Sequence, residues 1–176
     1  MATKTLRAES RTNHRQPALV KSHIDLSESL RTQMCELLNQ HLANTTDLYT
    51  QTKHAHWNVK GPDFMQLHEL FDLLADGVEE YIDIIAERIT ALGGVAHGTT
   101  RMAAAASRLP ETALGAANGI DYLKHLVTLY STTAQAVRPD IDAADEAGDM
   151  GTSDLLIDVV RDLDKWRWFL EAHLQG

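Results

Sequence analysis

The order of apolar and polar residues predicts long amphipathic helices from Leu26 onward, with almost no strand-like alternation. The first helix is expected to begin after Asp25, with Glu28 in the position of a capping-box partner. It should end before Gly61-Pro62, because proline cannot continue the hydrogen-bond pattern of a helix. Its apolar stripe repeats at helical spacing and comprises Leu30, Met34, Leu37, His41, Leu42, Leu48 and Tyr49.

The second helix is expected between a cap at Asp63 and the Gly93-Gly94 pair, since glycine commonly ends helices. Residues 95–119 are rich in Ala, Gly and Thr and contain Pro110, so they predict a long connection with a short helix at Met102–Ser107. The second helix has one buried face, which comprises Leu67, Leu70, Phe71, Leu74, Val78, Ile82, Ile85, Ile89 and Leu92.

A heptad of apolar residues predicts a third helix over residues 120–141, in which Pro139 is a candidate for a kink. A fourth helix is expected to follow a turn marked by glycines, with Thr152 or Ser153 as its cap. Four long helices with one long crossover in the middle form the ferritin-like arrangement. The sequence therefore predicts an all-α, ferritin-like four-helix bundle.

This bundle domain is expected over residues 25–176, after a flexible basic N-terminal tail at residues 1–24. The length of 176 residues fits one domain, and an apolar fraction of 44% is ordinary for a globular protein. Neither a membrane span nor the apolar core of a secretion signal is visible, so we expect a cytoplasmic protein. Cys35 is the single cysteine, which excludes an internal disulfide, and its apolar neighbours predict a buried thiol.

The formal charge of −9 is unevenly distributed, because the first 21 residues carry +4 and the remainder therefore carries −13. A basic tail on an acidic body indicates a polyanion as a partner for the tail and cations as partners for the body. DNA is one candidate partner, and a plain disordered tail is the alternative. The basic residues of the tail are Lys4, Arg7, Arg11, Arg15 and Lys21.

Two pairs of metal-binding residue types lie on the second helix, His68 with Asp72 and Asp83 with Glu87, each four residues apart. His68, Asp72 and Asp83 each follow a core position by one residue, and Glu87 follows Asp83 by one helical turn, so the four side chains should share a face beside the core stripe. Asp72 and Asp83 are roughly 16 Å apart along the helix, which is too far for both to bind one metal ion within one chain.

The two pairs are, however, symmetric about position 77.5. Two antiparallel copies of this helix around a two-fold axis near Gly77 would place His68 and Asp72 of one chain opposite Asp83 and Glu87 of the other. Gly77 and Ala75 would then permit a close approach of the two helices. A set of imidazoles and carboxylates suits Fe(II), Zn or Mn, whereas the alternative is an ordinary solvated acidic face.

Several segments resemble the Dps family, the DNA-binding proteins from starved cells: KHAHWNVKG at 53–61, FMQLHELFD at 64–72, DIIAERITALGG at 83–94 and RDLDKWRWFLEAHL at 161–174. The resemblance implies a homododecamer, built from two-fold dimers, that oxidises iron at the dimer interfaces, with hydrogen peroxide as the favoured oxidant, and stores the mineral inside. The implied iron ligands are His56, His68 and Asp72 of one subunit with Asp83 and Glu87 of its partner. Trp57 would lie beside this site and quench radicals.

The resemblance also implies a negative pore at a three-fold axis, through which iron enters, with Asp145, Asp149 and Asp154 at the matching positions. Some relatives have an acidic residue where Met150 stands here. The leading hypothesis is therefore an iron-storing ferroxidase that protects against oxidative damage. The alternative is a DNA-compacting protector, associated with the nucleoid, whose metal site is vestigial or filled by zinc. His54, His97 and His173 have no assigned role.

Overall fold

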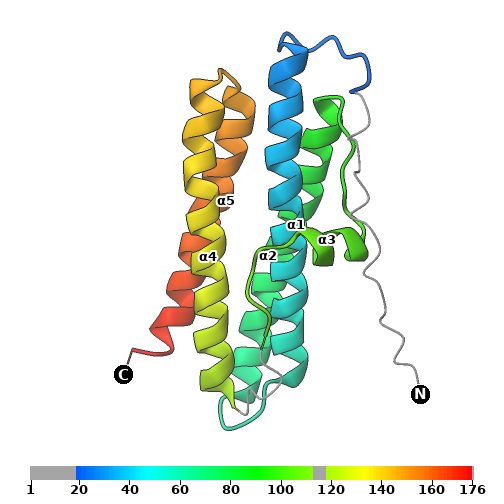
Figure 1. The fold of residues 1–176 in the computed structure, drawn as a ribbon. Helices are drawn as coiled ribbons and strands as arrows, with labels where there is room; N and C mark the ends of the chain where they lie inside the picture. The colour runs from blue at the N-terminus through cyan, green and yellow to red at the C-terminus, as the bar shows by residue number, and fades with distance from the viewer. Residues whose placement is uncertain (1–18, 113–117, 176) are drawn as a thin grey trace, which may run out of the picture.

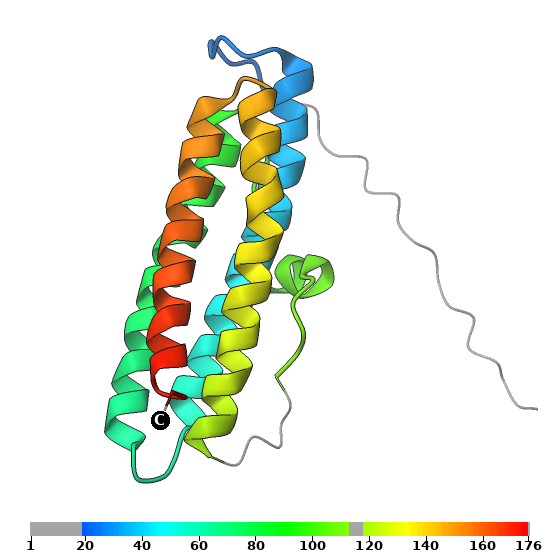
Figure 2. The ribbon, with the colours of Figure 1, turned by 90° about the vertical axis from the view of Figure 1, so that its left-hand side faces the viewer.

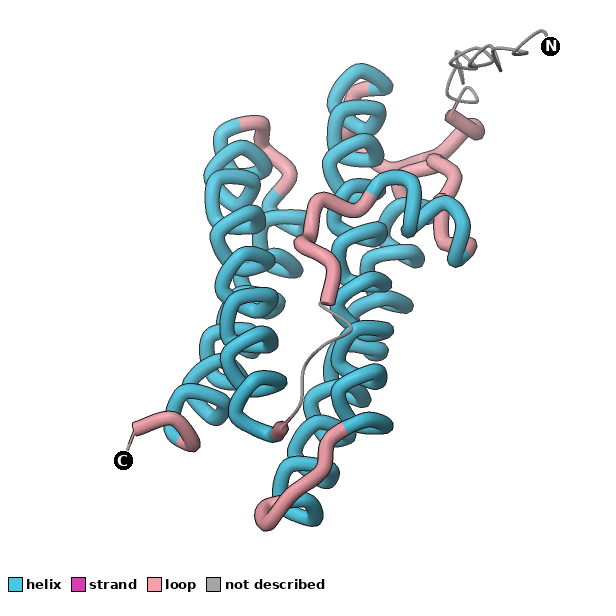
Figure 3. The backbone as a smooth tube through the Cα atoms, turned by 60° about the horizontal axis from the view of Figure 1, so that its bottom comes forward, coloured by secondary structure: helices cyan, strands magenta, loops and turns pink. Residues whose placement is uncertain are grey.

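The computed structural model describes residues 19–112 and 118–175, and the part of the chain that it describes contains helices and loops but no strand (Figure 3). Four long helices and one short helix follow in order along the chain. They are α1 at Glu28–Asn58, α2 at Phe64–Ala91, α3 at Thr100–Ala106, α4 at Gly119–Glu146 and α5 at Met150–Ala172. The predicted all-α, ferritin-like fold is confirmed.

The four long helices form two antiparallel hairpins that pack side by side (Figure 1). Helix α1 packs mainly on α2, and α4 packs mainly on α5, while α1 and α4 join the two hairpins. The first hairpin ends at one end of the bundle and the second begins at the opposite end, so the connection between them runs along the length of the bundle. Helix α3 lies against α1 on this path (Figures 1 and 2). The long crossover predicted from composition is thus present.

The core lies between the two hairpins and is built from the helical stripes that the sequence predicts. Its fully buried side chains are large and come from all four long helices, which explains why the bundle excludes water along its length. Cys35 is among the buried residues, as expected. The largest of them are Met34, Leu38, Leu42, Leu48, Phe71, Leu74, Ile85, Ile89, Leu92, Leu123, Leu126 and Tyr130.

Several predicted helix ends differ in detail from the observed ones. Helix α1 is capped by Ser27, whose hydroxyl accepts a hydrogen bond from the Leu30 amide at 3.2 Å, rather than by Asp25. Asp63 occupies the cap position of α2 but makes no side-chain capping bond. Gly93 ends α2 with a φ of +89°, a left-handed conformation that favours glycine over any other residue. The short helix begins at Thr100, slightly before the predicted start.

The chain already lies against the bundle from Leu19, where Val20 donates its amide hydrogen to the Gly93 carbonyl at 2.8 Å. Leu19 and Ile24 pack on the core as partly buried side chains. This segment therefore holds the start of α1 to the end of α2. No helix in the described ranges is both long enough and apolar enough to cross a membrane.

Candidate metal centre

Two histidines meet where the end of α1 passes the start of α2. The His56 and His68 rings stack with centroids 3.8 Å apart and planes 20° apart. Each ring nitrogen Nδ1 bonds the backbone carbonyl oxygen of the other histidine, at 2.8 Å from His56 and 2.9 Å from His68. Because a carbonyl oxygen only accepts, both Nδ1 atoms must carry hydrogen. In the neutral rings, both Nε2 atoms then keep a lone pair for a metal ion.

Asp72 lies beside this histidine pair, with its Oδ1 atom 3.7 Å from His56 Nε2. Lys53, on the same side of α1, donates a hydrogen bond to the same carboxylate oxygen. This hydrogen bond lowers the pKa of Asp72 and raises the pKa of Lys53. Asp72 is therefore an anion at neutral pH, and a lysine occupies one of its oxygens.

Lys53 was not identified from the sequence, although one signal was present. It stands three residues before His56 on α1, so helical spacing places both side chains over the same part of α2. Its ammonium group would have to release or share Asp72 when a cation binds. The sequence pattern alone contains no information on which carboxylate it contacts.

Asp83 and Glu87 lie further along α2 and are exposed, whereas His68 and Asp72 are partly buried. The structure thus places all four candidate side chains of α2 outside the core, in agreement with their predicted helical phase. His56, His68 and Asp72 come together within one subunit, whereas Asp83 and Glu87 do not join them. In the parts of the chain described here, no three His, Cys, Asp or Glu side chains are arranged to hold one metal ion.

Trp57 follows His56 at the end of α1 and has 67% of its surface exposed. Several other apolar side chains around α2 are also exposed, among them Met65 at 55% and Ile84 at 45%. They interrupt the acidic face at intervals along the helix. A surface of this mixed kind is typical of a protein interface.

Gly77 and Ala75 have a different role from the predicted close approach between subunits. A Cβ atom added to Gly77 would lie 2.4 Å from Cζ2 of Trp166 on α5. Ala75 is fully buried inside its own bundle. The absence of a side chain at position 77 therefore makes room for the Trp166 indole, and the predicted role of Gly77 and Ala75 in a close approach of two subunits is wrong.

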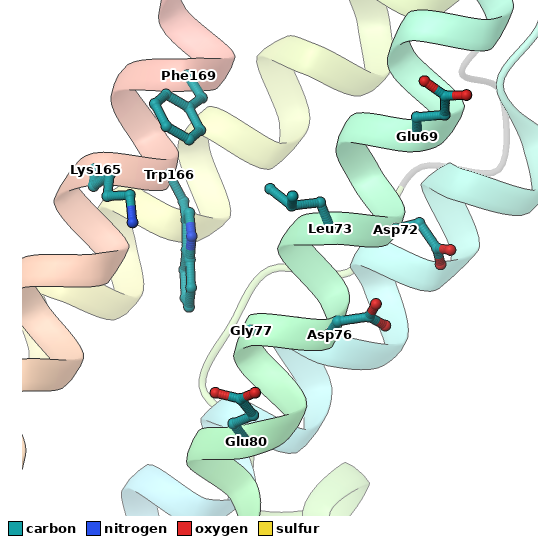
Figure 4. Close-up of a pocket in the computed structure, with 9 residues that line it drawn as sticks. All are labelled: Glu69, Asp72, Leu73, Asp76, Gly77, Glu80, Lys165, Trp166 and Phe169. Carbon is teal, nitrogen blue, oxygen red and sulfur yellow. The ribbon is translucent and has the colours of Figure 1, made fainter.

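An open pocket of about 580 Å³ lies between α2 and α5 at this point (Figure 4). Figure 4 shows Trp166 extending from α5 towards Gly77, while Asp72 and Asp76 point away from α5. One carboxylate of the candidate centre therefore borders the same pocket as a tryptophan. The pocket is lined by Glu69, Asp72, Leu73, Asp76, Gly77, Glu80, Lys165, Trp166 and Phe169.

Comparison with known proteins identifies the family of this chain. Residues 35–176 match the family model of the ferritin-like domain. The DNA protection during starvation protein of Agrobacterium fabrum is 39% identical over 155 residues, which cover 88% of this chain and 96% of that protein. The chain belongs to the Dps family.

Solved Dps structures share the whole bundle. DpsC from Streptomyces coelicolor superposes with a TM-score of 0.87 at 32% identity, over 94% of this chain and 97% of that one. The Dps protein of Vibrio cholerae O1, described as a member of a broad superfamily of ferritin-like diiron-carboxylate proteins, gives 0.83 at 30% identity, over 90% of this chain and 99% of that one.

For this Dps chain, the structure separates the three acidic residues that were expected at the pore. Asp145 and Asp154 are exposed near the turn between α4 and α5. Asp149 is only 2% exposed and caps α5 in place of the predicted Thr152 or Ser153. It accepts hydrogen bonds from Arg88 Nη2 at 2.6 Å, from the Thr152 amide at 3.0 Å and from the Thr152 hydroxyl at 2.6 Å. Both oxygens of its carboxylate are thus bonded inside the subunit, while the next residue, Met150, is 63% exposed.

The predicted DNA-binding residues lie mostly beyond the structural description of this Dps chain. Lys4, Arg7, Arg11 and Arg15 fall outside the described residues. Lys21 is exposed on the segment that lies against the bundle. Among the five predicted DNA-binding residues, Lys21 alone lies within the described residues.

Proposed function

We propose that this protein oxidises Fe(II) at two equivalent sites of a two-fold dimer. Each site takes His56, His68 and Asp72 from one subunit and Asp83 and Glu87 of the partner subunit. The observation that carries the proposal is the pair of reciprocal hydrogen bonds between the two histidines. Each Nδ1–H donates to the backbone oxygen of the other histidine, which keeps both Nε2 atoms available as ligands. An ordinary solvated surface does not need stacked histidines fixed in this tautomer.

The second pair of carboxylates supports the dimeric form of the site. His68 and Glu87, like Asp72 and Asp83, are equidistant from position 77.5, so an antiparallel copy of α2 brings one pair opposite the other. Both carboxylates of the second pair are exposed and can be reached by a second subunit. The exposed Trp57, Met65 and Ile84 supply apolar surface that such a contact would bury.

Iron is the substrate of the proposed reaction, and a set of two imidazoles and three carboxylates suits Fe(II). The carboxylates also stabilise the higher charge of Fe(III), which favours oxidation at the site. We propose hydrogen peroxide as the oxidant and a homododecameric cage as the store of the ferric product. Removing Fe(II) and peroxide together would protect other molecules in the cytoplasm from oxidative damage.

The Lys53 ammonium next to Asp72 gives the proposed site a defined state without iron. A protonated lysine balances the charge of the Asp72 carboxylate until a metal ion replaces it. Binding of Fe(II) then displaces the ammonium group from one oxygen. The exposed Asp145 and Asp154 are proposed as the acidic pore residues, and Asp149 is not.

The test is the rate of Fe(II) oxidation after anaerobic mixing with hydrogen peroxide, followed by ferric absorbance. Substituting His68→Ala or Asp83→Ala should slow the reaction by at least tenfold while the assembly keeps its size on a sizing column. As a matched control, Asp158→Ala removes a half-exposed carboxylate of α5 that pairs with Arg161, and it should leave the rate unchanged. Equal rates in all four proteins would overturn the proposal.

A second candidate function, binding of DNA, is favoured by the basic tail and by relatives named for DNA protection during starvation. Lys and Arg on a tail suffice for phosphate contacts, and many tails on one cage would bind with avidity. Deleting residues 1–18 should then abolish a salt-sensitive gel shift of duplex DNA. Absence of any shift by the full-length protein at low salt would remove this candidate.

A further inference from the structure

Trp166 lies at the centre of an aromatic cluster that contains none of the proposed iron ligands. Its ring contacts two tyrosines edge to face, Tyr81 of α2 with centroids 6.2 Å apart and Tyr130 of α4 with centroids 6.3 Å apart. Trp166 is 6% exposed and Tyr130 is fully buried, so these two rings lie inside the subunit, while Tyr81 is partly buried. Aromatic rings in contact exchange electrons readily, and tryptophan and tyrosine are the side chains most easily oxidised by one electron.

The two tyrosines are equally distant from Trp166 but differ in the partner of their hydroxyl group. Tyr81 donates its hydrogen to the Asp162 carboxylate at 2.8 Å. The Tyr130 hydroxyl lies 3.2 Å from the Thr52 hydroxyl, and no carboxylate bonds to it within the described ranges. A phenol that loses an electron becomes a strong acid and must lose its proton, and only a carboxylate is a base that can take it. Oxidation of the cluster should therefore end at Tyr81.

The cluster is also close to the proposed iron site. Trp166 lines the same pocket as Asp72, a proposed ligand, and packs against Gly77 between the two ligand pairs of α2 (Figure 4). Gly77 is five residues from Asp72 and six from Asp83, which is within roughly 10 Å of each along the helix axis. An oxidant formed at either site of a dimer would thus find this indole nearby.

We propose that Trp166, Tyr81 and Asp162 form a relay that takes up single oxidising equivalents from the iron site and holds them as a neutral Tyr81 radical. The inference rests on the proposed iron oxidation, because that reaction supplies the oxidant. One Fe(II) reduces hydrogen peroxide by one electron, which gives Fe(III), hydroxide and a hydroxyl radical. Trp166 gives an electron to the hydroxyl radical, which becomes hydroxide.

Tyr81 then returns an electron to the oxidised indole and passes its phenolic proton to Asp162. A second Fe(II) reduces the Tyr81 radical, the proton moves back from Asp162, and a second Fe(III) results. The sum is two Fe(II) and one peroxide converted to two Fe(III) and two hydroxide ions, with no radical released. The relay thereby couples the one-electron oxidation of two Fe(II) ions to the two-electron reduction of one hydrogen peroxide molecule.

The experiment compares Tyr81→Phe with Tyr130→Phe, a control at the same distance from Trp166 that lacks the carboxylate partner. Fe(II)-loaded assemblies are mixed with hydrogen peroxide, frozen within milliseconds and examined by electron paramagnetic resonance. Wild type and Tyr130→Phe should give a tyrosyl signal that Tyr81→Phe loses. Asp162→Asn, which keeps an acceptor but removes the base, should reduce the signal several-fold. Spin-trapped hydroxyl radical should rise several-fold in Tyr81→Phe and stay unchanged in Tyr130→Phe.

Equal tyrosyl and hydroxyl yields in the two tyrosine variants would overturn the relay. The rate of Fe(II) oxidation in the same mixtures reports separately on the proposed function. If wild type fails to oxidise iron, the relay is tested without iron. Azide radicals generated by pulse radiolysis then serve as the one-electron oxidant of the tryptophan. Conversion of the tryptophan radical to a tyrosyl radical must then be weaker in Tyr81→Phe than in Tyr130→Phe, and equal conversion would exclude the relay.

Discussion

Replacing Asp149 distinguishes a structural carboxylate from a pore residue. In Asp149→Ala, α5 loses its cap, which costs about 1 kcal/mol in comparable helices. Arg88 also loses its buried partner, a change that costs about 3–5 kcal/mol when the remaining charge is fully enclosed. Since the Arg88 side chain is 21% exposed and keeps its bond to Thr152, the lower end of that range applies. We expect a loss of about 4 kcal/mol in the free energy of unfolding.

For a chain of this length, 1 kcal/mol corresponds to about 2–4 °C in Tm, so Asp149→Ala should melt roughly 8–16 °C below wild type. Circular dichroism at the helical band measures the melting. Asp149→Asn keeps the capping oxygen and should lose about half as much, whereas the exposed Asp154→Ala should change stability by about 0.5 kcal/mol or less. A normal Tm for Asp149→Ala together with slowed iron uptake would refute this reasoning and return Asp149 to the pore.

Three further predictions follow from particular contacts. Gly77→Ala should lower the free energy of unfolding by about 1–3 kcal/mol, because its Cβ would meet Trp166; an unchanged denaturation midpoint would contradict that contact. Burial raises the pKa of the Cys35 thiol, so a chromogenic disulfide reagent at pH 8 should react with it quickly only after unfolding, and a fast native reaction would refute its burial. Lys53→Gln frees Asp72 from its ammonium partner and should tighten binding of Co(II), used as a redox-stable cation, by several-fold in calorimetry; weaker binding would show that Lys53 supports the site.

The helices and the exposed face of α2 could be predicted because both depend on local periodicity. A residue that follows a core position by one must point about 100° away from the core, wherever the other helices lie. His68, Asp72, Asp83 and Glu87 were therefore placed outside the bundle from spacing alone. The burial of Cys35 followed from the same pattern.

The errors concern residues whose role depends on distant partners. Asp149 resembles its acidic neighbours in sequence, and only Arg88, far away on α2, shows that it is buried and paired. Gly77 suggested a contact between subunits, whereas its actual neighbour is Trp166 on α5. The spacing of Lys53 from His56 did not reveal its partner, because its contact with Asp72 depends on how α1 crosses α2.

The histidine pair shows what the structure adds to a correct residue choice. Sequence spacing placed His56 and His68 near the ends of two consecutive helices but gave no tautomer. The two bonds to backbone oxygens, at 2.8 Å and 2.9 Å, supply it. Both Nε2 atoms are therefore available to a metal ion because of backbone positions that only the packed hairpin defines.

Complementation between two inactive subunits tests the shared site most directly. In a mixed dimer of His68→Ala with Asp83→Ala, both changes fall in one site, and the other site has a complete ligand set. Coexpression at equal levels should make about half of the dimers mixed, and so restore roughly one quarter of the wild-type sites. A site shared between two subunits predicts this recovery of the Fe(II) oxidation rate, with almost no oxidation by either variant alone. No recovery in coassembled cages would contradict a site shared between subunits.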